Sequence, residues 1–336
     1  MRQVVYIGDE TFRIQGYAPA PPGPGQVQID VAYTGICGTD LHIKHGVMDA
    51  RVTRPAVIGH EMSGRVASAG PGVEGWSAGD PVTVMPLAWC GDCPACTNGH
   101  THICHRLNFI GIDSAGSLQQ RWIVPASALV RLPAGLALDH AALVEPTAVA
   151  VHDVRRGAVR PGETVVVVGG GPVGQLIALV ARRAGADVLL VEPDAYRRGV
   201  ADGFGLRTVA PADAPGYVTD WTGGAGAAVA FEVSGAAAGV GTAVDVLAVR
   251  GRLVLVAIHG QPREVNLHRF FWRELTLIGA RLYDRSDFEE AVALVAAGDI
   301  PAAALISRVV PLDGVADAFT ALEGGGVMKV LVACEA

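Results

Sequence analysis

The chain has 336 residues, a length typical of two domains, and half of them are hydrophobic, which is enough for a sizeable core. The formal net charge is −7 and no basic cluster occurs, which argues against nucleic acid or an anionic membrane as partner. No basic, apolar leader opens the chain, so we expect a cytoplasmic protein with reduced thiols.

Residues 1 to about 35 are predicted to be β structure, with a half-buried strand where polar and apolar residues alternate over Gln26–Val31. The strand leads into Cys37–His42, which holds a thiol, a hydroxyl, a carboxylate and an imidazole. His60, Glu61 and Glu145 add an imidazole and two carboxylates further on. Such ligands, with one position left for water or substrate, are typical of a catalytic zinc site. A buried structural cysteine and a turn histidine are the alternative.

The next strands are predicted over residues 55–68 and 82–84, and a cysteine cluster with the spacing C-x2-C-x2-C-x7-C follows. Four thiolates at such short steps can close a tetrahedral structural zinc site. The cluster consists of Cys90, Cys93, Cys96 and Cys104. We expect His100, His102 and His105 to face solvent, because the thiolates already complete the metal's shell.

A strand is predicted within residues 116–125, and an apolar helix that includes His152 follows Glu145. A buried carboxylate is costly unless it is paired or bound to a metal. Its apolar surroundings therefore favour Glu145 as a neighbour of the zinc.

Near residue 150 the pattern changes to alternating strands and helices. Thr164–Val168 is a continuous apolar run, as expected of a parallel strand covered on both faces. Gly169, Gly171 and Gly174 follow as G-x-G-x-x-G, then a helix to Ala184. Such glycines let the backbone approach a pyrophosphate at the helix N-terminus.

The second strand of this unit, Asp187–Val191, ends at Glu192, which can accept hydrogen bonds from the adenosine ribose. Because Glu192 would repel a 2′-phosphate, NAD is favoured over NADP. Arg197 and Arg198 could instead accommodate that phosphate, or could lie on a solvated helix face.

The remaining elements continue the β/α alternation and then return toward the first part of the chain, where the last ones are expected to pack on the β unit. A capping box over Ser286–Glu289 is predicted to open the helix that runs to about Ala297. The other predicted strands are 228–233, 252–257, 275–279 and 329–333, and the other helices are 239–249 and 314–322.

On these motifs the chain resembles the zinc-dependent medium-chain dehydrogenases/reductases, the alcohol dehydrogenase superfamily. Val144-Glu145-Pro146 with the later Val151-His152-x-x-Arg155-Arg156 resembles its polyol and sorbitol–butanediol branch. The resemblance implies an α/β protein. Residues 1–148 would form a GroES-like catalytic domain with a structural-zinc lobe at about 88–106. Residues 149–278 would form a doubly wound Rossmann domain that binds NAD, and residues 279–336 would complete the catalytic domain.

The same resemblance implies roles for single residues. Cys37 and His60 would bind the catalytic zinc, Glu61 would bind it directly or in exchange with water, and Glu145 would bind it or lie just behind its ligands. Thr39 and His42 would relay the proton. The dinucleotide contacts would be Gly169, Gly171, Pro172, Val173, Gly174, Glu192 and Arg197, with Val256, Ala257, Ile258, Ala280, Arg281 and Leu282 at the nicotinamide end.

One position departs from the sorbitol dehydrogenases, which carry a polyol-binding arginine where this chain has Leu282. Arg281 is adjacent, but neighbouring residues of a strand face opposite ways. A smaller diol, or a polyol held by other groups, is therefore favoured over sorbitol.

The resulting prediction is an oxidoreductase with two zinc ions per chain that transfers a hydride between NAD(H) and a secondary alcohol or ketone. The substrate would be a polyol, a sugar-derived alcohol or a vicinal diol. The alternatives are an amino-alcohol dehydrogenase for threonine or an aminocyclitol, and a non-catalytic zinc- and NAD-binding protein. The resemblance also implies a homodimer or homotetramer.

Overall fold

The computed structural model describes residues 1–335 and divides the chain into two compact units. Unit 1 consists of Met1–Glu145 together with the chain from Asp284 onward, and unit 2 is Pro146–Tyr283. Unit 1 is therefore built from two separate stretches of sequence, whereas unit 2 is continuous. None of the helices in residues 1–335 is long and apolar enough to cross a membrane.

Unit 1 is organised around a seven-stranded sheet with the order β16-β17-β3-β4-β5-β9, in which β8 also pairs with β3. The strands are β3 (Gln26–Gly35), β4 (Glu61–Ala69), β5 (Pro81–Val84), β8 (Arg121–Pro125), β9 (Leu129–Arg131), β16 (Ile306–Pro311) and β17 (Lys329–Ala333). The last strand, β17, lies between β16 and β3 and runs antiparallel to β3. The prediction that the C-terminal elements pack on the β unit is confirmed.

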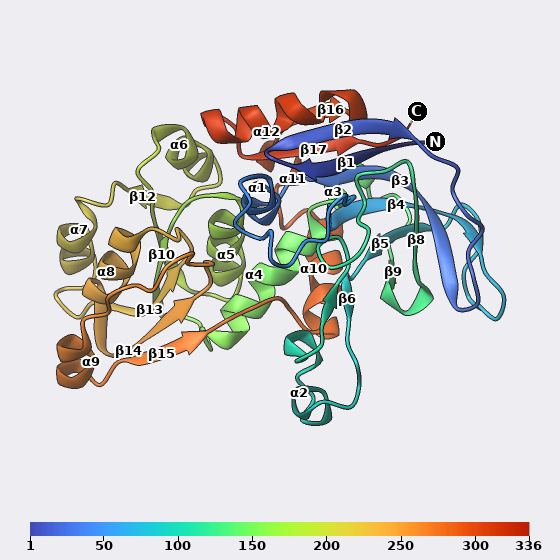
Figure 1. The fold of residues 1–336 in the computed structure, drawn as a ribbon. Helices are drawn as coiled ribbons and strands as arrows, with labels where there is room; N and C mark the ends of the chain where they lie inside the picture. The colour runs from blue at the N-terminus through green and yellow to red at the C-terminus, as the bar shows by residue number, and fades with distance from the viewer. Residues whose placement is uncertain (336) are drawn as a thin grey trace. The chain divides into compact units, whose positions relative to one another are not determined.

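The rest of unit 1 surrounds this sheet and includes a lobe that projects from it (Figure 1). The lobe is formed by β6 (Leu87–Ala88), α2 (Pro94–Thr97), η1 (Thr101–Ile103) and β7 (Asn108–Phe109). The other elements are the hairpin β1 (Arg2–Gly8) and β2 (Thr11–Gly16), α1 (Gly38–Lys44), η2 (Ala126–Ala128), α3 (Leu138–Ala141), α10 (Arg285–Ala297), α11 (Ala302–Leu305), η3 (Leu312–Gly314) and α12 (Val315–Gly324). Met1 and Glu335 line one surface hollow, so the two ends of the described chain lie close together.

Unit 2 is a six-stranded parallel sheet with the order β12-β11-β10-β13-β14-β15. Its strands are β10 (Thr164–Val168), β11 (Asp187–Val191), β12 (Arg207–Val209), β13 (Ala227–Glu232), β14 (Leu247–Leu255) and β15 (Thr276–Gly279). In chain order this is 3-2-1-4-5-6, the arrangement of a dinucleotide-binding fold, whose ligand lies where the strand order reverses. The reversal falls between β10 and β13.

Helices connect the strands of unit 2, and β10 is buried as its apolar run predicts. The helices are α5 (Pro172–Arg183), α6 (Ala195–Gly203), α7 (Ala214–Trp221), α8 (Ala237–Asp245) and α9 (Leu267–Arg273), and α4 (Val144–Arg156) spans the boundary of the two units. The bounds predicted for the first two strands of this unit are confirmed, and α5 begins one residue before the predicted helix.

Three local predictions are wrong. The helix predicted to reach Val249 ends at Asp245, because the buried Leu247 pairs with Ala227 and begins β14. The apolar run there suits helix or strand equally, and only pairing decides. The capping box of α10 is Asp284 with Asp287, so Ser286 lies inside the helix.

The third correction concerns Arg281 and Leu282. The last strand of unit 2 ends at Gly279, and Leu282 has a left-handed backbone with φ of 59°. Strand alternation therefore does not apply to this pair, and the argument that Arg281 faces away from the position of Leu282 fails.

Candidate active site

The end of β3 and the start of α1 place Cys37. It is the N-cap residue of α1, and its backbone N–H donates to Asp40 Oδ2 at 2.9 Å. Gly35, just before it, leaves room for a neighbouring carboxylate, because a Cβ there would lie 2.3 Å from Glu61 Oε2. The strand pairing of Gly35 with Glu61 thus brings the first and second candidate ligand segments together.

Cys37, His60 and Glu61 form one cluster in unit 1, with ligand atoms that all lie within 4.8 Å of one another. His60 Nδ1 is buried and has no hydrogen-bond partner in residues 1–335. A soft thiol, an imidazole and a carboxylate so close together form a donor set that fits zinc.

Electrostatics around His60 also favour a cation. Burial lowers the pKa of His60, but Asp40, Cys37 and Glu145 outweigh burial and raise it to about 10. Asp40 Oδ1 lies 3.8 Å from His60 Nδ1 and is itself buried. Asp40 stands inside the cysteine motif, but no role was predicted for it, because only the fold turns its side chain toward His60.

Lys329 is the second residue that sequence reasoning missed. Its Nζ donates to Glu61 Oε1 at 2.8 Å, to Glu61 Oε2 at 2.6 Å and to the carbonyl oxygen of Ile36 at 3.2 Å. Both side chains of the pair are almost completely buried. A signal was present, since this chain has 24 arginines and only two lysines, and Lys329 opens an apolar strand.

Glu145 lies in the first turn of α4 with 3 % of its surface exposed. It is not part of the 4.8 Å cluster, but its charge raises the pKa values of His60 and Lys329. Its charge is therefore near enough to act on the cluster.

Thr39 and His42 are three positions apart on α1, so they share one face of that helix. Thr39 is half-buried, and His42 Nδ1 is buried without a hydrogen-bond partner in residues 1–335. A half-buried hydroxyl and an imidazole with a free ring nitrogen are suitable for handing on a proton.

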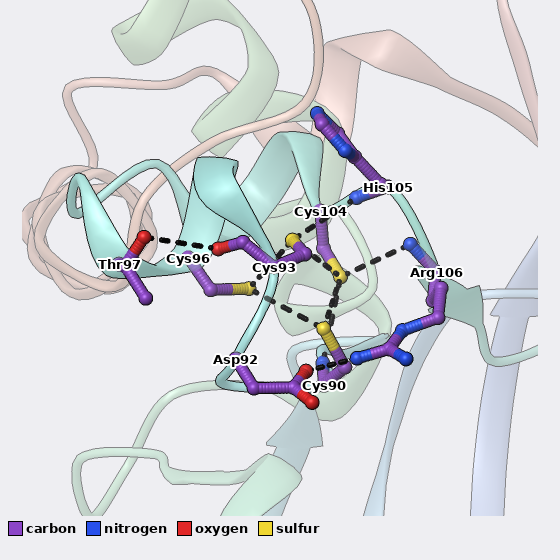
Figure 2. A network of polar contacts seen from close by, with 8 residues as sticks. All are labelled: Cys90, Asp92, Cys93, Cys96, Thr97, Cys104, His105 and Arg106. Atoms are coloured by element: carbon purple, nitrogen blue, oxygen red, sulfur yellow. Dashed lines mark hydrogen bonds and ion pairs between the residues drawn. The ribbon is translucent and has the colours of Figure 1, made fainter.

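The four cysteines of the lobe converge on one point (Figure 2). Neighbouring sulfurs are 3.4 to 3.9 Å apart, as in the Cys90–Cys104 and Cys90–Cys96 pairs. A tetrahedral zinc site with Zn–S of about 2.3 Å requires sulfurs about 3.8 Å apart. The geometry therefore fits a structural zinc, as the spacing predicts.

Backbone N–H groups favour the thiolate form of Cys93 and Cys104 in this lobe. His105 N donates to Cys93 Sγ, and the N–H groups of Cys90 and Arg106 donate to Cys104 Sγ. The backbone N–H groups of Cys96 and His105 lower the pKa of Cys93 to about 6. Beside the sulfurs, the Arg106 guanidinium pairs with Asp92 and holds the pKa of that carboxyl at about 2 (Figure 2).

One histidine of the lobe contradicts the prediction that all three face solvent. His102 is buried, and its Nδ1 lies 2.9 Å from Asp284 Oδ1. Asp284 comes from the C-terminal stretch of unit 1, so the contact joins segments that no local pattern could relate.

In unit 2 the glycine motif follows β10 and opens α5, for which Gly171 is the N-cap. Gly169 has φ of 110°, a left-handed conformation that favours glycine. A Cβ on Gly174 would lie 1.8 Å from the carbonyl oxygen of Gly169, so this position requires glycine for close packing of helix and loop. Pro172 and Val173 form the first turn after Gly171, where the helix dipole favours an anion.

Glu192 follows β11 and is buried, with its carboxylate accepting from Gly170 N at 2.6 Å and Asp194 N at 2.8 Å. Arg198 is committed to the carbonyl oxygens of Glu192 and Pro193. Arg197 differs from it, because its Nε is buried without a hydrogen-bond partner in residues 1–335.

The segments predicted to line the nicotinamide end lie at the carboxyl ends of β14 and β15. Val256 N and Ala257 N donate to the carbonyl oxygen of Glu232, and Ala280 N donates to that of Leu255. Ile258 is 59 % exposed. The backbone of unit 2 therefore places these segments at the sheet edge where such folds bind a dinucleotide.

Two family models match the chain, the alcohol dehydrogenase GroES-like domain over residues 23–134 and the zinc-binding dehydrogenase over residues 172–297. Together with the relatives below, these matches show that the chain belongs to the zinc-dependent alcohol dehydrogenase superfamily. The predicted family and fold class are confirmed.

Among its relatives is the 2-dehydro-3-deoxy-L-galactonate 5-dehydrogenase of Pseudoalteromonas atlantica, which is 50% identical over 335 residues and covers 98% of each chain. The sorbitol dehydrogenase of Halalkalibacterium halodurans is 32% identical over 97% of this chain and 96% of its own. The crystal structure of 2R,3R-butanediol dehydrogenase from Bacillus subtilis has a TM-score of 0.90 at 29% identity, with 99% of each chain covered. The polyol branch of the family is thereby confirmed.

The chain is thus a zinc-dependent oxidoreductase that transfers a hydride between a nicotinamide dinucleotide and a polyol or other sugar-derived alcohol. This class of activity is what the motifs predicted.

Proposed function

We propose that the substrate is the secondary hydroxyl of a polyhydroxy acid, in the class of the 2-dehydro-3-deoxy-aldonates, and that NAD is the hydride acceptor. The support is the identity of 50% across 98% of both chains with a dehydrogenase of that substrate class. The substrates named for relatives at 32–34% identity are neutral, the polyol sorbitol and the ketose D-xylulose.

We propose that Cys37 and His60 hold the catalytic zinc, with Glu61 or Glu145 as the carboxylate ligand. The 4.8 Å cluster and its thiol, imidazole and carboxylate donors support this assignment. Bound zinc supplies a Lewis acid that polarises the alcohol or carbonyl oxygen, and the nicotinamide accepts or donates the hydride. The residue that does not bind the metal, Glu61 or Glu145, adds negative charge beside it.

The proton that leaves the hydroxyl is carried by residues of α1. Thr39 accepts it at its hydroxyl oxygen and gives up its own hydroxyl proton in exchange. His42 takes up the relayed proton at the ring nitrogen that has no partner and releases it to water. Cys90, Cys93, Cys96 and Cys104 hold the structural zinc and keep the lobe folded.

NAD is preferred over NADP in this proposal because the Glu192 carboxylate is fixed at the end of β11 by two backbone N–H groups. A fixed negative charge there accepts ribose hydroxyls and repels a phosphate. Arg197 lies beside the phosphate-binding loop, where a Cβ on Gly171 would be 4.0 Å from its Nη1. It is therefore assigned to the pyrophosphate. The nicotinamide end is assigned to Val256, Ala257, Ile258, Ala280, Arg281 and Leu282.

For the whole chain we keep the predicted domains, 1–148 and 279–336 for the catalytic domain and 149–278 for the Rossmann domain. We also propose a homodimer or homotetramer. Unit 2 exposes apolar side chains near the edge strand β15, and an unpaired edge favours association with a second copy. These side chains are Leu267, Phe271, Trp272 and Leu277. The six free cysteines suit a cytoplasmic location with reduced thiols.

The proposal is tested by incubating zinc-loaded protein and NAD with a panel of alcohols and following the absorbance of reduced nicotinamide. The panel contains 2-dehydro-3-deoxy-L-galactonate, other aldonates, sorbitol, 2,3-butanediol and threonine. Highest kcat/KM on the acids is the expected result, with loss of turnover in Cys37→Ser and retention in Cys334→Ser, a cysteine outside both metal clusters.

Preference for a neutral polyol or for threonine would refute the acid assignment while leaving the dehydrogenase class intact. No turnover with any member, in protein shown to contain two zinc ions, would favour a non-catalytic role.

A further inference from the structure

Glu232 is a fully buried carboxylate in unit 2 to which the proposed reaction gives no role. It ends β13, and its Oε1 accepts from Ser234 Oγ at 2.5 Å, Ser234 N at 3.0 Å and Gly235 N at 3.1 Å. Its Oε2 lies 2.9 Å from His259 Nε2. These donors offset the cost of burying the charge, so the carboxylate is held in one orientation.

The contact to His259 has a definite direction. Arg263 Nε donates to His259 Nδ1 at 3.3 Å, and an arginine can only donate. His259 Nδ1 therefore accepts, and Nε2 carries the hydrogen that bonds Glu232. Arg263, His259 and Glu232 form a chain of directed hydrogen bonds from the surface to the centre of the sheet edge.

The main chain of Glu232 acts on the same segment as its side chain. Its carbonyl oxygen accepts from Val256 N at 3.0 Å and Ala257 N at 3.1 Å, while its carboxylate holds His259. One residue thus holds residues 256–259 at both ends. Ser234, which donates to Glu232, also packs against the phosphate-binding loop, where a Cβ on Gly169 would lie 2.8 Å from Ser234 N.

Packing does little to hold this segment. Ile258 is exposed, and residues 260–264 are exposed as well. A hollow of about 440 Å³ opens beside them. His259 and Arg263 are among the residues that line it. Because Ile258 and the residues after His259 are exposed, the position of this end of the segment depends on the polar chain.

We propose that Glu232 and His259 are positioning residues for hydride transfer, which hold Val256–Ile258 in the place that the nicotinamide ring contacts. The inference rests on the proposed function, in which this segment lines the nicotinamide end. Glu232 and His259 touch neither substrate nor the reacting atoms; they act through the segment between them.

The test compares the dissociation constants of NADH and ADP-ribose in zinc-loaded protein by titration calorimetry. ADP-ribose has every part of the dinucleotide except the nicotinamide ring, so the ratio of the two constants reports contacts to that ring alone. His259→Leu cannot donate to Glu232, and we expect its NADH affinity to fall about tenfold, the equivalent of about 1.4 kcal/mol. Its ADP-ribose affinity should change by less than about twofold.

His259→Gln is the rescue variant, because its amide donates to Glu232 and accepts from Arg263, and we expect it to restore NADH affinity. Arg263→Gln should give a smaller loss of NADH affinity. Arg207→Gln is the matched control, because Arg207 pairs with Asp187 in the same unit and takes no part in the Arg263–His259–Glu232 hydrogen bonds. An equal loss for both ligands, or no loss for either, would overturn the proposal. Wild-type protein that binds neither NADH nor ADP-ribose would refute the proposed function itself.

Discussion

At the scale of single residues, the buried Lys329–Glu61 pair holds one carboxylate of the candidate metal cluster in place. Burial alone would lower the pKa of Lys329, but Glu61, with Cys37 and Glu145, outweighs burial and raises it, so the lysine is charged. Its three donors meet three acceptors, two on Glu61 and one on Ile36. A buried pair of this kind fixes the position of Glu61 whether or not that residue binds the metal.

Replacing Lys329 with Met leaves the Glu61 charge buried without its partner. We expect the free energy of unfolding to fall by about 3–5 kcal/mol, measured by urea denaturation of the zinc-loaded protein. Lys44→Met is the matched control, because Lys44 is the only other lysine and its pair with Glu323 is more exposed. That control should lose no more than about 1 kcal/mol. Equal losses in the two variants would contradict this reading of the buried pair.

Cys334 gives a prediction about pH. Burial raises the pKa of the Cys334 thiol from 9.0 to about 12. Above pH 9 the unfolded chain loses this proton while the folded chain keeps it, so the group's contribution to stability is complete below pH 9 and is lost as pH rises toward 12. The loss approaches about 1.4 kcal/mol per pH unit in this window. In urea melts, the free energy of unfolding of Cys334→Ala should decline less steeply between pH 9 and 12 than that of the wild type. The same decline in both proteins would exclude the effect.

At the scale of elements, the glycine motif performs two separable tasks. Gly174 permits α5 to pack on the loop that holds Gly169. Gly171 has ordinary backbone angles, and only Arg197 Nη1, at 4.0 Å, lies near its Cβ position. Gly174 is therefore assigned to the packing of the fold, and Gly171 is assigned to the approach of a pyrophosphate.

The two glycines should respond differently to a methyl group. Gly174→Ala forces a 1.8 Å contact with the carbonyl oxygen of Gly169, so we expect a loss of about 2–3 kcal/mol in the free energy of unfolding. Gly171→Ala should leave stability within about 0.5 kcal/mol and weaken NADH about tenfold or more. Urea melts and calorimetry measure the two quantities, and a Gly171→Ala variant with unchanged NADH affinity would contradict the assignment.

Element boundaries show where local patterns stop being informative. The spacing of the cysteines and the strand-glycine-helix run were read correctly because the residues concerned lie within short stretches of one another. The end of α8 and the N-cap of α10 were predicted wrongly. The strand pairing of Leu247 decides the first, and the position of Asp284 decides the second. Locally, the residues after Asp245 suit a helix as well as a strand, and Ser286 suits an N-cap as well as Asp284 does.

At the scale of the whole molecule, unit 1 needs both of its stretches. Strand β17 lies between β16 and β3 in the sheet and carries Lys329 to Glu61. Unit 2, in contrast, takes all six strands of its sheet from one continuous stretch.

A chain that ends at Met328 should therefore lose the catalytic zinc, because the sheet opens beside β3 and Glu61 loses its partner. We expect limited proteolysis to degrade unit 1 and to leave a resistant fragment near residues 146–283 that still binds ADP-ribose. A chain that ends at Cys334 retains β17 and is the control. Full zinc content in the Met328 variant would show that β17 is dispensable.

The sequence by itself determined the family, both zinc-ligand sets as candidates, the dinucleotide-binding motif and the order of most strands and helices. It did so because most of these signals are local spacings and periodicities within about 30 residues. The catalytic set, which extends from Cys37 to Glu145, was joined by the types of its ligands and by the resemblance to the family. The tertiary structure decided which carboxylate pairs with Lys329, that His102 is buried against Asp284, and that Glu232 holds His259. Lys329 and Glu61 are 268 positions apart, and such a pair forms only because β3 pairs with both β4 and β17. The energy of a buried charge depends on what the fold brings around it, and no local pattern carries that information.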